Sequence, residues 1–189
     1  MTWRRLLAPG LIAGLLLTGA PTRSDTMTLR LSSSAFADGG TIPVVHTCDG
    51  EDLSPPLAWS GIPADTRSLA LIVEDPDAPD PRAPKTTWTH WIVYDIPPAT
   101  AGVAAGARPA GAREGLNDWQ RTGYRGPCPP IGRHRYIHRL YALDVVLGDL
   151  HQPTRAALLR AMQGHVLAQA QLVGSYSREA NGHVSGSGE

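Results

Sequence analysis

Proline and glycine constrain this sequence more than any other residue types. The chain of 189 residues contains 17 prolines and 20 glycines. Proline lacks a backbone donor and glycine weakens regular structure, so each of them interrupts a helix or marks a turn. The sequence therefore argues against a helical bundle and favours short strands joined by shaped loops.

The composition indicates one folded domain. Hydrophobic residues make up 42% of the chain and charged residues 18%, which suits one good core and is neither disordered nor fibrous. The 17 Lys and Arg residues balance the 17 Asp and Glu residues. Without a positive field or a basic stripe there is no electrostatic basis for binding nucleic acid.

The first 20 residues have the order of parts of an export signal. Arg4 and Arg5 precede an apolar run over residues 11–17, and small residues follow it up to Ala20. We expect cleavage after Ala20, which leaves a mature chain of net charge −2. The run is too short to cross about 30 Å of hydrocarbon, so no permanent anchor is expected, although a retained membrane helix is the alternative. The expected location is the periplasm or the extracellular space.

Cys48 and Cys128 are the only cysteines in the chain. In an oxidising compartment a lone pair is expected to form a disulfide, which here would close an 80-residue loop. Two buried free thiols, or one reactive thiolate, are the alternatives. No CxxC spacing supports a zinc or redox site.

The pattern of apolar residues predicts mainly strands. Short β-like segments are expected at 28–32, 42–46 and 57–59, and longer strands at 68–74, 88–96 and 134–146. Strict alternation in the strand 88–96 would place residues 88, 90, 92, 94 and 96 on one face and residues 89, 91, 93 and 95 on the other. In the strand 134–146, His134, Tyr136 and His138 share a face.

The C-terminal part reads as a helix. It is expected to begin near Pro153 and to continue to Val173, with a break or kink near Gly164, because apolar residues recur there at intervals of three and four. Residues 99–114 are read as a surface connection with one short strand. The predicted organisation is a signal peptide (1–20), a lead-in (21–35), one domain (36–176) and a disordered tail (177–189).

Three segments carry polar groups that a structural loop would not require. They are Asp75–Pro79 (DPDAP), His90 with Trp88 on the same strand face, and the segment Gly126–Tyr136 (GPCPPIGRHRY). Prolines restrict the shapes of the first and third segments. If the three segments meet, one carboxylate and two imidazoles line a rigid pocket.

These motifs resemble the signature elements of the phosphatidylethanolamine-binding protein family, also called Raf-kinase-inhibitor-like proteins. DPDAP, the Trp-x-His at 88–90 and GPCPPxGxHRY at 126–136 match those elements, and CDGxDxSPPLxWSGxP at 48–63 is similar to the bacterial branch. The resemblance runs from about Phe36 to Tyr176. Together these motifs are far more specific than DPDAP alone.

The resemblance implies a mainly β fold of two packed, largely antiparallel sheets with a C-terminal helix. It also implies an anion pocket formed by Asp75, His90 and His134. The implied walls of that pocket are Pro79, Trp88, Pro129 and Tyr136.

Other polar residues are expected to have structural roles. Asp77 is expected to cap its own turn, and Arg135 to point to the opposite strand face and form an ion pair. His138 is expected in the core, and His165 in the helix against the sheet. Glu51 and Asp52 are read as solvated turn residues, whose loop would be drawn towards the pocket if Cys48 bridges Cys128.

The predicted function is non-catalytic binding of a small anionic ligand, such as a phosphate compound or a phospholipid head group. Imidazole N–H groups donate to phosphate oxygens, and the carboxylate of Asp75 fixes the tautomer and orientation of a neighbouring histidine. The alternative from a different class is inhibition of a serine protease or a kinase through stiff loops such as 75–84. Hydrolysis ranks third, because the chain has neither HExxH nor GxSxG. No cofactor is expected.

Overall fold

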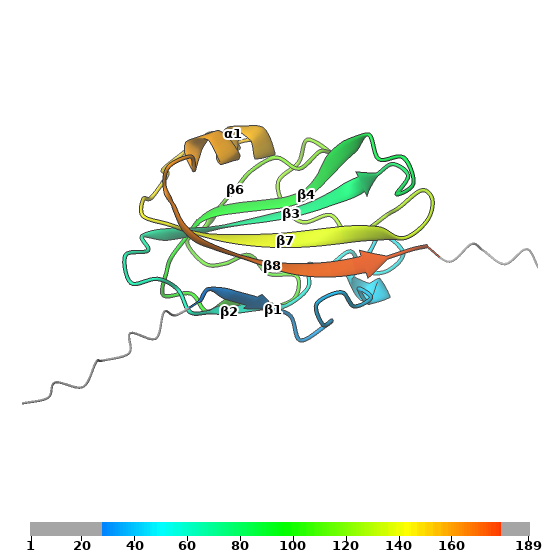
Figure 1. Cartoon of the computed structure of the whole chain (residues 1–189), viewed down its shortest axis with the longest axis horizontal. Coiled ribbons are helices and arrows are strands. Elements are labelled where there is room, and N and C mark those ends of the chain that lie inside the picture. The colour runs from blue at the N-terminus through cyan, green and yellow to red at the C-terminus, as the bar shows by residue number, and fades with distance from the viewer. Residues whose placement is uncertain (1–27, 179–189) are drawn as a thin grey trace, which may run out of the picture.

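Two antiparallel sheets and one short helix form the fold in the computed structural model, which describes residues 28–178 (Figure 1). The small sheet has the order β1-β2-β5, and the large sheet has the order β6-β4-β3-β7-β8. The strands of the small sheet are β1 (Arg30–Ser32), β2 (Leu57–Ser60) and β5 (Gly102–Val103). Those of the large sheet are β3 (Ser68–Ala78), β4 (Thr86–Ile96), β6 (Arg113–Glu114), β7 (His134–Leu143) and β8 (Val166–Tyr176). The predicted mainly β, two-sheet fold is confirmed.

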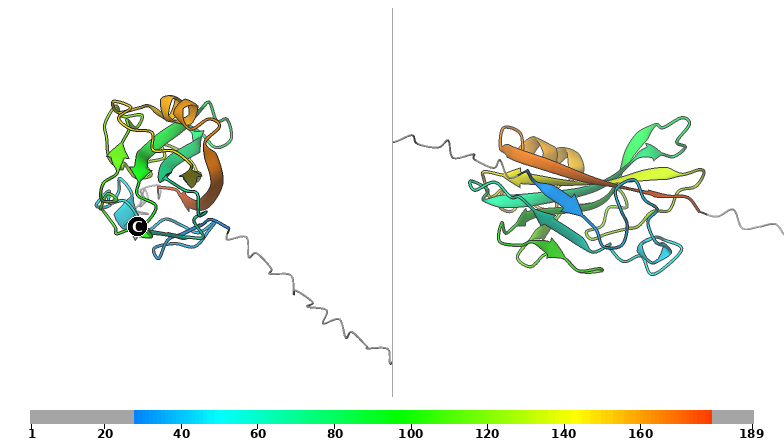
Figure 2. Two further views of the ribbon diagram at one scale, coloured as in Figure 1. Left: turned by 90° about the vertical axis from the view of Figure 1, so that its left-hand side faces the viewer. Right: turned by 60° about the horizontal axis from the view of Figure 1, so that its bottom comes forward.

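The main core lies between the two sheets, which Figure 2 shows end-on and from below. Inward-facing residues of β3, β4 and β7 meet side chains from β1 and β2, and those of β3 and β7 alternate along their strands. This core is formed by Leu29, Leu31, Phe36, Ile42, Leu57, Trp59, Leu69, Leu71, Val73, Trp91, Val93, Ile96, Ala112, Tyr136, Leu140, Ala142, Leu172 and Tyr176.

A second apolar cluster covers the outer face of the large sheet. Helix α1 (Arg155–Ala161) begins at Thr154, whose side chain accepts a hydrogen bond from the backbone of Ala157. Leu158 of this helix packs on Ile72 and its neighbours in the sheet. Because α1 buries the outer face and the small sheet the inner one, β3 is buried on both faces, as its continuous apolar sequence predicts.

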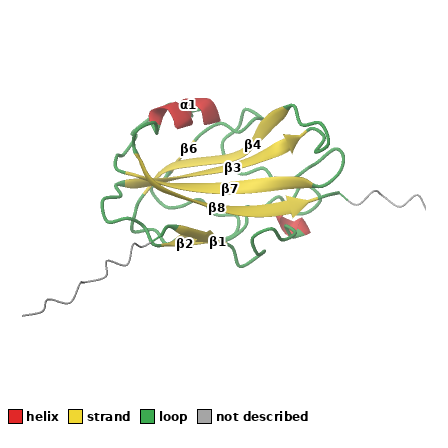
Figure 3. Cartoon of the chain, in the orientation of Figure 1, coloured by secondary structure: helices red, strands yellow, loops and turns green. Residues whose placement is uncertain are grey.

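The prediction of a helix to Val173 is wrong, because only residues 155–161 are helical (Figure 3). Gly164 adopts a positive φ of 82° and ends the helical segment. Residues 166–176 then form β8, in which every second residue faces the inner core. In this segment apolar residues recur at intervals of three and four, which suit a helix, and also at intervals of two, which suit a strand. Pairing with β7 selects the strand.

Four smaller expectations also differ from the structure. The segment 42–46 contains a 3₁₀ helix, η1 (Val44–His46), in place of a strand. Strand β7 ends at Leu143 and not at residue 146. Two short strands, β5 and β6, replace the single one expected between residues 99 and 114. Strand β3 continues to Ala78, so most of the DPDAP motif is strand and not loop.

Strand β4 does not alternate strictly. Its register with β3 shifts between Val73 and Glu74, and Asp95 has a positive φ of 54°. Trp91 belongs to the inner core and Ile92 lies under α1, whereas the shift places Trp88 opposite Asp75, on the same side as Trp91. The expected grouping of residues 88, 90, 92, 94 and 96 on one face is therefore wrong.

The predicted signal peptide, residues 21–27 of the lead-in and residues 179–189 of the tail lie outside the described residues. Within residues 28–178, no helix combines the length and the apolar character needed to cross a membrane.

Candidate functional site

Asp75 lies near the end of β3, on the face that carries Leu71 and Val73 into the inner core. One carboxylate oxygen, Oδ2, accepts a hydrogen bond of 2.7 Å from Nδ1 of His134. The other, Oδ1, accepts one of 2.8 Å from the backbone of Asp77. Both oxygens are occupied, so the carboxylate is held in one position.

His134 begins β7 and is fully buried. Its Nε2 lies 3.0 Å from the carbonyl oxygen of Ile131, and its ring stacks on that of Tyr136. Each ring nitrogen therefore faces an oxygen acceptor, which fixes the orientation of the imidazole. The pairing of His134 with Asp75 joins two of the three segments identified in the sequence.

His90 supplies the second imidazole from β4. The register shift between β3 and β4 allows its ring to lie on the same side as that of Trp91, where it makes an edge contact of 5.2 Å with Tyr136. Its Nδ1 donates a 2.6 Å hydrogen bond to the carbonyl of Arg125. Burial lowers the pKa of His90, so the neutral ring carries its proton on Nδ1 and leaves Nε2 as an acceptor. Among the described residues, this Nε2 has no hydrogen-bond partner.

These groups border one cavity of about 290 Å³. All seven residues predicted as its ligand-binding set lie in its wall: Asp75, Pro79, Trp88, His90, Pro129, His134 and Tyr136. The indole Nε1 of Trp88 and the hydroxyl of Tyr136 are buried, and neither has a hydrogen-bond partner within residues 28–178. Burial raises the pKa of Tyr136, which keeps the hydroxyl protonated.

Sequence reasoning missed Trp119, which also lines the cavity. Its ring meets those of His90 and Trp88 edge-on at 5.2 and 5.4 Å. The surrounding loop is ordered by Asn117, whose side-chain oxygen accepts from the backbone of Trp119 and of Arg121. A large aromatic residue in an otherwise polar loop, two residues after an Asn, was the available signal.

The predicted disulfide between Cys48 and Cys128 is present, and Cys128 lines the cavity. It joins the loop after η1 to the proline-rich wall. Asp52 reinforces the same junction, because its carboxylate accepts from the backbone of Gly126 at 2.6 Å and pairs with Arg125. Asp52 is therefore more than a solvated turn residue, and the bridge draws its loop towards the cavity, as expected for a bonded Cys48–Cys128 pair.

Asp77 and Arg135 form an ion pair beside the site. Nε and one terminal nitrogen of Arg135 donate to the two oxygens of Asp77 at 2.9 and 2.6 Å. This guanidinium holds the pKa of Asp77 below its usual range. The ion pair expected for Arg135 is confirmed, whereas the capping role expected for Asp77 is performed by Asp75.

The two remaining histidines differ in outcome. His138 is fully buried on the inner face of β7, as expected. His165 lies in the turn after α1 and not in a helix, and its ring donates to Asp144 at 2.8 Å.

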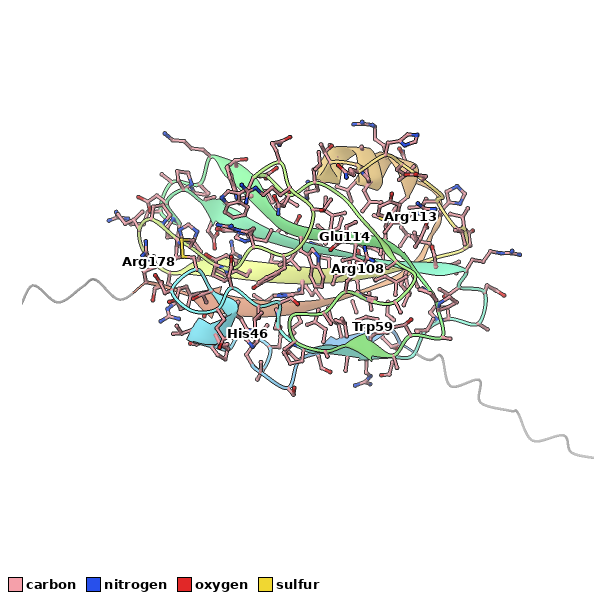
Figure 4. The ribbon with its side chains drawn as sticks, turned by 180° about the vertical axis from the view of Figure 1, so that it is seen from behind. His46, Trp59, Arg108, Arg113, Glu114 and Arg178 are labelled. Atoms are coloured by element: carbon pink, nitrogen blue, oxygen red, sulfur yellow. A yellow bond between two sulfur atoms is a disulfide. The ribbon has the colours of Figure 1, made fainter. Side chains whose placement is uncertain are left out.

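A larger hollow of about 900 Å³ adjoins the cavity and shares Pro130 with it. Tyr176 lines this hollow, and its hydroxyl donates to Asp49. Arg178 also pairs with Asp49, at 2.9 Å. Figure 4 shows Arg178 and His46 towards the same end of the molecule, away from Arg113.

Within the described part of the chain, no three His, Cys, Asp or Glu side chains come together in a group that could hold a metal ion.

A family model described as phosphatidylethanolamine-binding protein matches residues 32–177 of the chain. The chain belongs to the phosphatidylethanolamine-binding protein family. Among the relatives of this family member, a UPF0098 protein of Methanothermobacter thermautotrophicus is 49% identical over 155 residues, which cover 79% of this chain and 99% of the relative. A UPF0098 protein of Chlamydia trachomatis is 45% identical over 151 residues, covering 80% and 100%.

Solved structures of other family members confirm the fold. A phosphatidylethanolamine-binding protein homologue from Chlamydia trachomatis is 44% identical with a TM-score of 0.76, over 81% of this chain and 99% of that one. The Escherichia coli protein YbcL, described as a member of the mammalian family, is 28% identical with a TM-score of 0.72, over 80% and 99%.

Proposed function

We propose that this protein binds small phosphate-containing ligands in the cavity between β3, β4 and β7. The observation that carries the proposal is the unpartnered Nε2 of His90, which lies in a wall shared with the fixed His134–Asp75 pair. A rigid cavity with a few convergent polar groups is typical of small-molecule sites. Membership of the family supports the same ligand class.

The chemistry of the wall suits a phosphate that retains one proton. Neutral His90 accepts a hydrogen bond at Nε2, so a protonated phosphate oxygen, or an ammonium group, would satisfy it. Trp88 Nε1 and the Tyr136 hydroxyl are donors without protein acceptors among the described residues. Phosphate oxygens would supply those acceptors, and buried donors gain most from being satisfied.

The size of the cavity favours a head group over a whole lipid. A volume of about 290 Å³ admits a phosphate with a short substituent. The substituent of a larger phosphate ester would extend past Pro130 into the neighbouring hollow. There Arg133 offers polar contacts and the exposed Ile131 offers apolar contacts.

We further propose that the protein acts outside the cytoplasm and without catalytic turnover. The apolar run before Ala20 and the disulfide support the first part. For the second part, the Asp75 oxygens and both His134 nitrogens are already engaged by protein atoms, which leaves them as positioning groups.

Binding of a protease or kinase stays an alternative prediction. The segment expected to serve as its exposed rigid loop was 75–84, but Asp75 and Ala78 belong to the buried end of β3. Only the connection 79–85, at the tip of the β3–β4 hairpin, projects into solvent (Figure 1).

Isothermal titration calorimetry with inorganic phosphate and with phosphoethanolamine tests the proposal. We expect saturable binding of at least one compound, which His90→Ala and Asp75→Asn each weaken by about tenfold or more. His165→Ala, which removes an exposed imidazole far from the cavity, is the matched control. The absence of binding by the wild type, or affinities that neither cavity variant changes, would refute the site.

A further inference from the structure

The peptide group between Arg125 and Gly126 controls the one ring nitrogen that His90 can offer to a ligand. The carbonyl of this group, on Arg125, lies 2.6 Å from Nδ1 of His90. A carbonyl oxygen only accepts hydrogen bonds, so Nδ1 must carry a proton. Burial lowers the pKa of His90 and keeps the ring neutral, which leaves Nε2 without a proton. The nitrogen available to a ligand is therefore an acceptor.

Asp52 holds the same peptide group from its other side. In a trans peptide such as this one, the N–H and the carbonyl point in opposite directions. The N–H of Gly126 donates to Oδ1 of Asp52 at 2.6 Å, while Oδ2 lies 3.4 Å from Nε of Arg125. The peptide group is thus hydrogen-bonded at both ends, and it cannot turn over without losing both bonds.

The orientation of this peptide group decides which ligands the imidazole can bind. If the group turned over, the N–H of Gly126 would face Nδ1 of His90, and the ring would have to carry its proton on Nε2. The acceptor that a ligand meets would then become a donor. Asp52 does not line the cavity, so its effect on a ligand passes through the peptide group and the ring of His90.

The other free polar groups of the cavity wall are donors. Trp88 Nε1 and the Tyr136 hydroxyl are buried and have no acceptor among the described residues. A ligand that satisfies the whole wall must bring acceptor oxygens and also a proton of its own. Hydrogenphosphate has both, whereas sulfate has the same tetrahedral shape but no proton at neutral pH. A sulfate oxygen next to Nε2 of His90 would set lone pairs against each other and leave a buried acceptor unsatisfied.

We propose that the cavity selects hydrogenphosphate over sulfate through the proton that Nε2 of His90 requires, and that Asp52 is the positioning residue that maintains this requirement. Because the selectivity requires an oxyanion beside His90, it rests on the proposed function. It narrows the ligand to phosphate compounds that bring a proton, or an ammonium group, to Nε2. A site built to hydrogen-bond one group of its ligand discriminates strongly against an analogue that lacks this group.

Isothermal titration calorimetry of the purified protein at pH 7.5, with inorganic phosphate and with sulfate, measures the selectivity. We expect the wild type to bind phosphate about a hundredfold or more tighter than sulfate. Asp52→Ala should lower this ratio by about tenfold or more, because the freed peptide group lets the ring adopt either tautomer. Asp52→Asn should retain the ratio, since its amide oxygen still accepts from Gly126.

Asp80→Ala is the matched control for the lost charge. The side chain of Asp80 is 28% exposed and that of Asp52 is 27% exposed, and each pairs with an arginine. Removing either carboxylate strengthens the attraction of both anions alike, so the ratio should change only in Asp52→Ala. Circular dichroism confirms that each variant is folded.

Nitrogen-15 NMR of the histidine rings provides a readout that a merely structural role of Asp52 would not move. The ring signals that are absent from His90→Gln identify His90. In the wild type and in Asp52→Asn, its proton should reside on Nδ1. In Asp52→Ala, the signals should show a mixture of the two tautomers.

Three results overturn the proposed selectivity while leaving the ligand cavity in place. They are equal affinities of the wild type for phosphate and sulfate, a proton on Nε2 of His90, and a ratio that Asp52→Ala does not change. The first two are measured on the wild type, so they decide the matter if Asp52→Ala does not fold. If phosphate, sulfate and phosphoethanolamine all fail to bind, the proposed function is refuted, and the selectivity with it.

Discussion

Replacing His138 by leucine should make the protein less sensitive to acid. His138 is fully buried beside the ring of Phe36, and neither of its ring nitrogens has a side-chain hydrogen-bond partner in the described chain. Burial lowers the pKa of His138 to about 4, against an ordinary value of 6.5. The ring is therefore neutral in the folded protein over a range of pH in which the unfolded chain binds a proton.

The sign and size of the effect follow from proton linkage. Because the folded pKa of His138 lies below the unfolded one, stability is lost as the pH falls below 6.5, until the folded pKa is reached. One unit of pKa difference corresponds to about 1.4 kcal/mol, so the full loss is about 3 kcal/mol and the loss at pH 5 is about 2 kcal/mol. Leucine also removes two unpartnered polar atoms, which should stabilise the protein by about 1 kcal/mol at pH 7.5.

Urea denaturation followed by tryptophan fluorescence, at pH 7.5 and pH 5, measures both quantities. We expect the free energy of unfolding of His138→Leu to exceed that of the wild type at both values, with a gap about 2 kcal/mol larger at pH 5. The buried His90 titrates in the same direction but is present in both proteins and cancels. Equal pH dependence in His138→Leu and the wild type would refute the reasoning.

Two further predictions concern the framework around the site. Replacing both Cys48 and Cys128 by alanine should lower the free energy of unfolding by about 4 kcal/mol, because the disulfide closes an 80-residue loop. The same change should weaken phosphate binding, because it loosens the cavity wall. A variant whose urea midpoint equals that of the wild type would contradict this prediction. Glu74→Gln should lower the free energy of unfolding by about 3 kcal/mol, because it removes a buried carboxylate that pairs with Arg139 and Arg155. Thermal melts compare this variant with Asp144→Asn, which removes an exposed carboxylate.

The residues of the site were predicted from the resemblance of their motifs to a known family. Local chemistry could not have joined Asp75 to His134, because the two residues are 59 positions apart and meet only through the pairing of β3 with β7. The disulfide was predictable because the chain has only two cysteines, so one pairing is available.

The parts that could not be predicted depend on tertiary contacts. Residues 166–173 carry spacings that suit either a helix or a strand, and only the partner strand β7 selects the strand. The face that His90 occupies depends on a register shift, which alternation by itself does not reveal. The role of Asp77 was assigned to its own turn because its partner, Arg135, lies 58 residues away in the chain.

The irregularity in β4 separates two tasks that one strand performs. From Trp91 onwards, packing in the core fixes which way the side chains of β4 point. Before Trp91, the side chains of Trp88 and His90 are oriented independently of that packing and line the cavity. Deleting a single residue there would restore ideal pleating, and the imidazole of His90 would then turn away from the cavity while the sheets remained assembled. Molecular recognition in such a chain can therefore be lost, or acquired, by a one-codon change that leaves the architecture intact.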